Sequence, residues 1–128
     1  MGNEDNKSES NQDLKQRTKG FALDVIALAE SLPSNETCRT IGRQLLRSGT
    51  SVGANYRAAK RAKSPSDFIS KMGTVEEEAD ESGYWMELLM DSGKIEPKTA
   101  AGLHRESVEL LAIAVASINT ARRSGGRQ

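Results

Sequence analysis

Five arginines are the side chains of this sequence best suited to binding a ligand, because their spacing follows the turns of an α-helix. Three are four residues apart, and the other two lie 18 residues beyond the first two, which is about five turns at ~3.6 residues per turn. They are Arg39, Arg43, Arg47, Arg57 and Arg61. A helix would bring four of the five onto one face, and such a cationic stripe suits the phosphate backbone of RNA or another nucleic acid.

The segment that follows the arginines has the opposite charge. Residues 67–91 hold eight acidic side chains and one lysine. If the two segments form an antiparallel helical hairpin, Arg43 would lie opposite Glu87. Arg57 would lie within about a turn of Glu76. Exposed ion pairs add only ~0–1 kcal/mol each, so such pairs would set register and partner choice more than stability.

These charges lead to two hypotheses for function. In the first, the protein is a non-enzymatic, oligomeric interaction module that binds RNA or another nucleic acid through the basic face. In the second, it is a protein-binding scaffold whose arginines pair with the acidic segment and which binds no nucleic acid. The exposure of the arginine face separates the two hypotheses.

A second group of residues has spacing that indicates a structural or interface role. Gly49 and Gly53 lie four apart in the middle of a long helical pattern, where each glycine costs about 1 kcal/mol relative to alanine. Close approach of another helix would compensate for that cost, with Asn55 as a buried polar residue that sets the register. Glu78 lies beside an apolar stripe and should pair with Arg47 or Arg57. The full group is Gly49, Gly53, Asn55, Tyr56, Glu78 and Trp85.

Catalytic and metal sites find little support in the sequence. There is one histidine, His104, and one cysteine, Cys38. A nucleophile, a base and an orienting group cannot be assembled from these two residues, and a di-iron bundle would need Glu-x-x-His on two helices. We therefore expect no enzymatic activity, no metal and no cofactor.

Composition and length indicate a single domain without a strong overall charge. The chain has 128 residues, with 18 basic and 18 acidic side chains and a net charge of zero. Any electrostatic attraction to nucleic acid must therefore come from a local patch.

Three prolines divide the chain into four segments with helical periodicity. They are Pro33, Pro65 and Pro97, each beside residues that favour a helix start. The pattern predicts helices at about 14–32, 36–63, 65–92 and 97–123, with an uncertainty of ~2–4 residues. Four long helices with short connections indicate an all-α, up-down-up-down four-helix bundle.

The two ends of the chain differ from the bundle in composition. Residues 1–13 are almost entirely polar and are expected to form a disordered tail, 14–123 the bundle, and 124–128 a flexible tail. No apolar run approaches the length of a membrane span or forms a secretory signal. We therefore expect a cytoplasmic protein with Cys38 as a free thiol and no membrane partner.

The first and last helical segments carry more apolar residues than one core face needs. The last segment has a second stripe, formed by Val108, Leu111, Val115 and Ile118. These residues either widen the core face or bury a second surface against another subunit.

The stretch RQLLRSGTSVGANYR, at 43–57, resembles the signature of a bacterial four-helix-bundle family encoded in intervening sequences of large ribosomal RNA genes. Matching segments at 58–64, 67–68 and 76–85 extend the resemblance, which covers roughly 21–117. The sequence is also similar to the accessory variability determinant of diversity-generating retroelements.

The resemblance implies a four-helix bundle that assembles as a ring-like homopentamer. For the accessory determinant it further implies a basic surface that engages RNA and a reverse transcriptase. The expected partners are therefore other copies of the chain, with five subunits favoured, and RNA or a nucleic-acid-processing protein.

Overall fold

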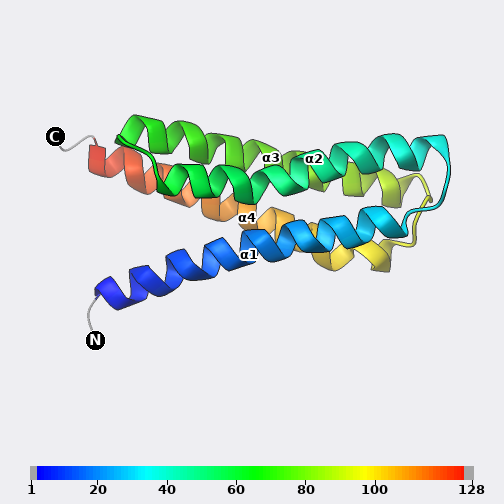
Figure 1. The fold of residues 1–128 in the computed structure, drawn as a ribbon, viewed down its shortest axis with the longest axis horizontal. Helices are drawn as coiled ribbons and strands as arrows, with labels where there is room; N and C mark the ends of the chain where they lie inside the picture. The colour runs from blue at the N-terminus through cyan, green and yellow to red at the C-terminus, as the bar shows by residue number, and fades with distance from the viewer. Residues whose placement is uncertain (1–2, 126–128) are drawn as a thin grey trace.

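Four antiparallel α-helices make up the computed structural model (Figure 1). It describes residues 3–125, with side chains from Asp13 onward. The helices are α1 (Asn3–Ser31), α2 (Glu36–Lys60), α3 (Pro65–Asp91) and α4 (Pro97–Gly125), and the described residues contain no strand. Each helix reverses the direction of the one before it, so the predicted all-α bundle is confirmed.

Local sequence signals set the helix ends. Asn35 caps α2, where its side-chain oxygen accepts a hydrogen bond from the Cys38 N–H at 2.8 Å. Ser64 caps α3 in the same way and accepts from the Asp67 N–H at 3.1 Å. After α3 the chain turns through Gly93, whose φ of 75° favours glycine.

The boundaries differ most from prediction at α1, which begins at Asn3 rather than at residue 14. The helix therefore extends into the segment predicted as a disordered tail, which contains no proline or glycine after position 2 to stop it. At the other end, α4 continues to Gly125. Residues 1–2 and 126–128, which belong to the two predicted tails, lie outside the described part of the chain.

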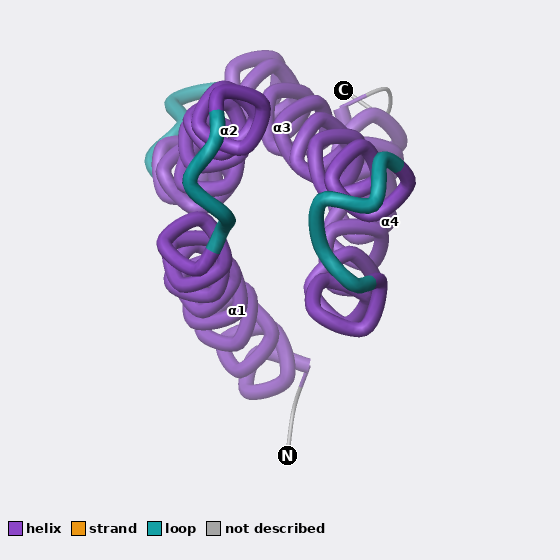
Figure 2. Tube along the Cα trace, turned by 90° about the vertical axis from the view of Figure 1, so that its right-hand side faces the viewer, coloured by secondary structure: helices purple, strands orange, loops and turns teal. Residues whose placement is uncertain are grey.

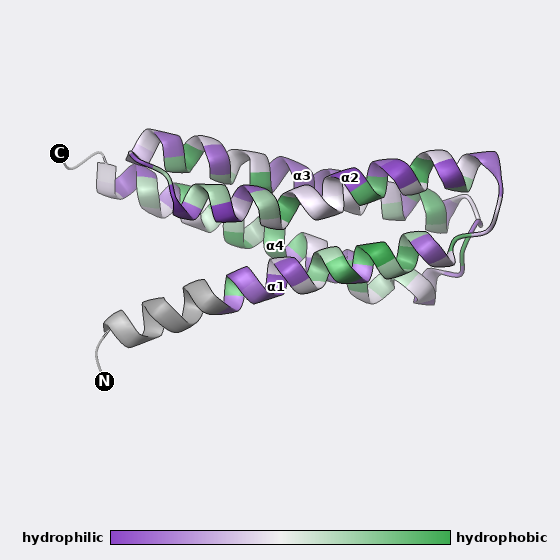
Figure 3. Cartoon of the chain, viewed as in Figure 1, coloured by the Kyte–Doolittle hydropathy of each residue, from purple (hydrophilic) through white to green (hydrophobic). Residues whose placement is uncertain are grey.

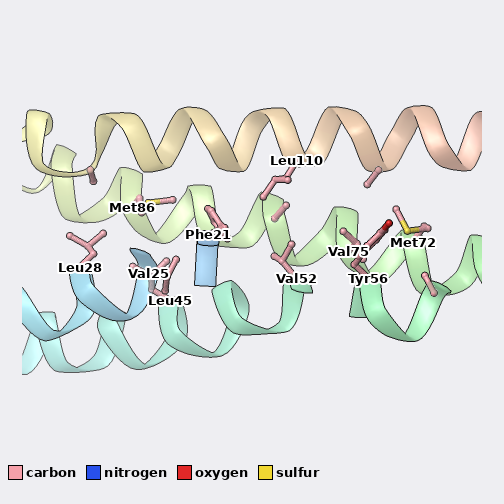
Figure 4. Packing of buried hydrophobic residues seen from close by; sticks show 14 of the residues in the cluster. Phe21, Val25, Leu28, Leu45, Val52, Tyr56, Met72, Val75, Met86 and Leu110 are labelled. Carbon is pink, nitrogen blue, oxygen red and sulfur yellow. The ribbon is translucent and has the colours of Figure 1, made fainter. Parts of the chain in front are cut away.

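The core runs along the inner faces of all four helices (Figures 3 and 4). Each helix contributes side chains at intervals of three and four residues, as amphipathic helices do. The largest fully buried side chains are Phe21, Leu45, Met72, Met86, Leu89 and Leu110.

The bundle is unevenly closed around its axis. Consecutive helices pack extensively, whereas α1 and α4 contact each other only sparsely (Figure 2). Arg17 on α1 reaches across to two carboxylates of α4. Its Nε lies 3.0 Å from Glu106 Oε2, and its Nη2 lies 2.6 Å from Glu106 Oε1. Nη2 also lies 2.8 Å from Glu109 Oε2. The hydrogen bond to Glu106 raises the pKa of Arg17 further above its ordinary value. This bidentate pair holds α4 to α1 where apolar contacts are few.

Glycines bring α1 and α2 unusually close. A Cβ atom added to Gly49 would lie 2.7 Å from both methyl carbons of Val25. One added to Gly53 would lie 3.2 Å from Thr18 Oγ1. The predicted close approach of another helix at these glycines is confirmed, and the approaching helix is α1.

We expect Gly49→Ala to destabilise the protein by about 1–3 kcal/mol, because Val25 must move to admit the new methyl group. Alanine forms helices better than glycine by about 1 kcal/mol. Helix propensity alone would therefore predict that this substitution stabilises the protein. Gly73→Ala is the matched control, since a Cβ there would meet nothing within 4 Å. It should stabilise the protein slightly. Denaturant unfolding at one protein concentration measures both, and equal midpoints for the two variants would contradict the close packing.

Candidate nucleic-acid interface

The outer face of α2 carries three of the five predicted arginines, and a fourth, Arg61, is the residue that caps the C-terminal end of the helix. Arg43, Arg57 and Arg61 are exposed and make no ion pair or hydrogen bond through their side chains in the described residues. Arg39 is 54% exposed and reaches Glu36 of its own helix at 3.3 Å. The helical return of these residues to one face thus leaves three guanidinium groups available and the fourth only weakly engaged.

Arg47, the fifth predicted site residue, points away from the others and toward α3. Its Nη1 lies 3.1 Å from Glu78 Oε2, and its Nη2 donates to Glu81. These carboxylates, with Glu81 foremost through its hydrogen bond, raise the pKa of Arg47. Trp85 donates from its indole nitrogen to the same Glu81 oxygen at 3.2 Å. Arg47 is therefore a link between α2 and α3, and the predicted pairing of Glu78 with Arg47 is confirmed.

The other predicted pairs between the basic and acidic helices do not form within the chain. Arg43 does not reach Glu87, whose carboxylate instead lies 2.8 Å from His104 Nε2 on α4. Arg57 does not reach Glu76. Because α2 turns its arginine face outward, α3 neutralises Arg47 alone among the five.

A groove between α1 and α2 lies beside this arginine face. Its volume is about 480 Å³, and none of its lining residues is acidic. Lys15 and Lys19 line it from α1 and Arg57 lines it from α2, with polar and small side chains between them. Contact between Thr18 and Gly53 brings the two helices together at this point. The two lysines were not among the predicted site residues, although their spacing of four is that of one helix face.

Asn55 was predicted to set the register between helices, but its side chain bonds within its own helix instead. Its side-chain nitrogen donates to the Ser51 carbonyl of its own helix at 2.8 Å, a local bond that small polar residues often make in helices. The buried polar contact between α2 and α3 is instead a pair of hydroxyls, with Ser82 Oγ donating to Ser48 Oγ at 2.9 Å. Serine gave no signal in sequence, because a lone hydroxyl on an apolar stripe also fits plain packing.

The aromatic residues lie in the core or on α3. Tyr56 is buried, and burial raises its pKa. Trp85 is half-buried, and its ring centroid lies 5.3 Å from that of the exposed Tyr84. Tyr56 thus lies in the core, Trp85 packs against it, and neither is exposed on the basic face.

Comparison with known proteins places the chain in a family. Residues 10–116 match the family described as 23S rRNA-intervening sequence protein. The chain belongs to this family. The resemblance inferred from residues 43–57 is thereby confirmed.

A search of solved structures found a similar four-helix protein without an assigned function. One similar solved structure is a protein of unknown function from the S23 ribosomal protein family of Bacteroides thetaiotaomicron VPI-5482. It is 33% identical, the match covers 82% of this chain and 97% of that one, and the TM-score is 0.77. No curated protein matches the sequence significantly.

The described residues were also searched for metal sites and for membrane-spanning helices. Within the described residues, no group of three or more histidine, cysteine or acidic side chains is placed to hold a metal ion. No helix in that part of the chain is long and apolar enough to cross a membrane.

We expect Arg47→Gln and Arg57→Gln to differ in their effect on folding. Arg47→Gln leaves Glu78 and Glu81 close together without a cation, so its denaturation midpoint should fall. Arg57→Gln removes a side chain without a partner in the described residues, so its midpoint should stay at that of the wild type. A lower midpoint for Arg57→Gln than for Arg47→Gln would reverse these assignments.

Proposed function

We propose that this protein is a non-enzymatic, oligomeric module of the cytoplasm that binds RNA through the face formed by α1 and α2. The main support for the proposal is a set of cations on one side of the bundle that have no acidic partner among the described residues. They are Arg43 and Arg57 on α2, Arg61 at its C-terminal cap, and Lys15 and Lys19 on α1.

Charge segregation explains how a neutral chain can attract a polyanion. The net charge is zero, but eight of the 18 acidic residues lie on α3 and only one, Glu36, lies on α2. The α2 side of the bundle therefore has a local excess of positive charge. Such a patch steers and holds phosphates even when the whole molecule is neutral.

The binding face is also separate from the residues that stabilise the fold. Arg47 and Arg17 engage carboxylates of the bundle. Arg43, Arg57 and Arg61 make no ion pair with another helix in the part of the chain that the structure describes. Replacing the exposed arginines should therefore change ligand binding without unfolding the protein.

The test is the salt dependence of RNA affinity, measured by fluorescence anisotropy. Each phosphate neutralised on a single strand contributes about −0.7 to the log–log slope. Replacing Arg57 and Arg61 with Gln should weaken binding and make the slope less negative by about 1 to 1.5. The matched control replaces Arg105 and Arg123, two exposed arginines of α4. It should change the RNA affinity and the salt slope much less. Absence of binding at about 50 mM salt would refute the proposal.

A scaffold without nucleic-acid binding is the second candidate, and one observation favours it. The outer side of α3 carries acidic residues that make no ion pair in the described residues: Glu76, Glu77, Asp80 and Asp91. A second subunit could place its α2 arginines against them. In that case the Arg57 and Arg61 replacements would loosen the assembly, and RNA binding would be negligible before and after.

Assembly itself is part of the proposal, with five subunits favoured. Exposed apolar side chains remain on two helices: Leu23 on α1, and Val108 and Val115 on α4. The other members of the α4 stripe, Leu111 and Ile118, instead pack against or within the core. The surplus apolar pattern on α4 is therefore divided between the core and an exposed strip.

Sedimentation at micromolar concentration should return a species of about five times 13.9 kDa. Val108→Glu combined with Val115→Glu should shift it toward smaller species, because a charge on an apolar contact surface must lose its hydration. Helical content, measured by circular dichroism, should be unchanged in this variant. A wild-type protein that sediments at 13.9 kDa would refute the assembly.

A further inference from the structure

The cations on the outer face of α2 are grouped rather than evenly spread. Arg39 and Arg43 form one pair, and Arg57 with the C-cap residue Arg61 forms the other, 18 residues further on. At ~1.5 Å per residue the pairs are about 27 Å apart along the helix axis. The exposed positions between them include Thr50 and Ala54, which carry no charge.

This face offers no platform on which an unpaired base could stack. The exposed aromatic side chain in the described residues, Tyr84, lies on α3. Phe21 and Tyr56, on α1 and α2, are buried. Proteins that bind single strands combine a basic groove with exposed aromatic rings, so this face is suited to contact the sugar–phosphate backbone alone.

The spacing of the two pairs is fixed because α2 is held along its length. Val25 packs directly on Gly49 on one side. On the other side, Arg47 binds Glu78 and a serine hydroxyl pair joins α2 to α3. A rigid row of charges matches a rigid polyanion without further ordering, whereas a flexible single strand would lose conformational entropy to match it.

We infer that the ligand of this face is double-stranded RNA, with α2 lying along the duplex so that its two arginine pairs contact phosphates one helical turn apart. This inference rests on the proposed function and specifies its ligand. The spacing of about 27 Å is close to one turn of an A-form duplex and shorter than the turn of about 34 Å in B-form DNA. Lys15 and Lys19 flank Arg57 across the groove and strengthen one of the two contacts.

Duplex length tests the inference directly. An RNA duplex of about 16 base pairs can reach both arginine pairs, whereas one of about 8 base pairs is shorter than a turn and can reach only one. At one salt concentration, we expect the longer duplex to bind at least about tenfold more tightly than the shorter one. It should also bind more tightly than an unstructured RNA strand of the same length and than a DNA duplex of the same length.

A variant separates this bridging from simple avidity between subunits. Replacing Arg39 and Arg43 with Gln should lower the affinity for the longer duplex by about tenfold. The affinity for the shorter duplex should stay unchanged, because that duplex binds at the Arg57 end. The control variant with Arg105 and Arg123 replaced should bind both duplexes as the wild type does.

Each remaining outcome has a definite consequence. A single strand or a DNA duplex that binds as tightly as the RNA duplex would overturn the inference while the proposed RNA binding stands. If the Arg39 and Arg43 variant lost the same fraction of its affinity for the short and the long duplex, the argument from spacing would be overturned. Failure to bind any RNA at low salt would overturn the inference and the proposed function together.

Discussion

The direct packing of α1 on α2 is the contact on which the proposed surface depends. At Gly49 the methyl groups of Val25 occupy the space that a side chain would fill, and at Gly53 the side chain of Thr18 does the same. Glycine inside a helix is unfavourable, so these positions are stable only while α1 covers them. The same contact brings Lys15 and Lys19 to the edge of α2 beside Arg57.

Each of three sides of α2 faces different surroundings. One side carries the glycines and faces α1. A second faces α3, where Arg47 binds Glu78 and Glu81 and a serine hydroxyl is buried against another. The third is open to solvent, and its arginines make no ion pair with another helix among the residues that the structure describes. Because the fold draws its ion pairs from the second side, the third side is available for a ligand.

Much of this arrangement could be predicted from sequence, because it rests on local patterns. The prolines and the capping residues Asn35 and Ser64 marked the helix starts, and apolar spacing marked the inner faces. The glycines indicated a close helix contact. Glu78 indicated an ion pair, because a carboxylate beside a core stripe needs a partner.

The rest depends on how the helices are turned about their axes, which spacing along one chain does not determine. Counting along a hairpin placed Arg43 opposite Glu87, but the rotation of α2 directs that arginine to solvent. Lys15 and Lys19 joined the surface only because α1 lies against α2 at Thr18. Asn55 found its partner within its own helix, so its polarity did not reveal a contact between helices.

Lysine reactivity in the presence of RNA tests most directly whether the α1–α2 groove is the binding surface. Acetylation by an amine-reactive reagent, read out by mass spectrometry, reports each lysine separately in the intact protein. If RNA lies along this groove, it should protect Lys15 and Lys19, while Lys94 and Lys98, near the turn between α3 and α4, react as before. Bound RNA that leaves Lys15 and Lys19 fully reactive would show that the groove is not the binding surface.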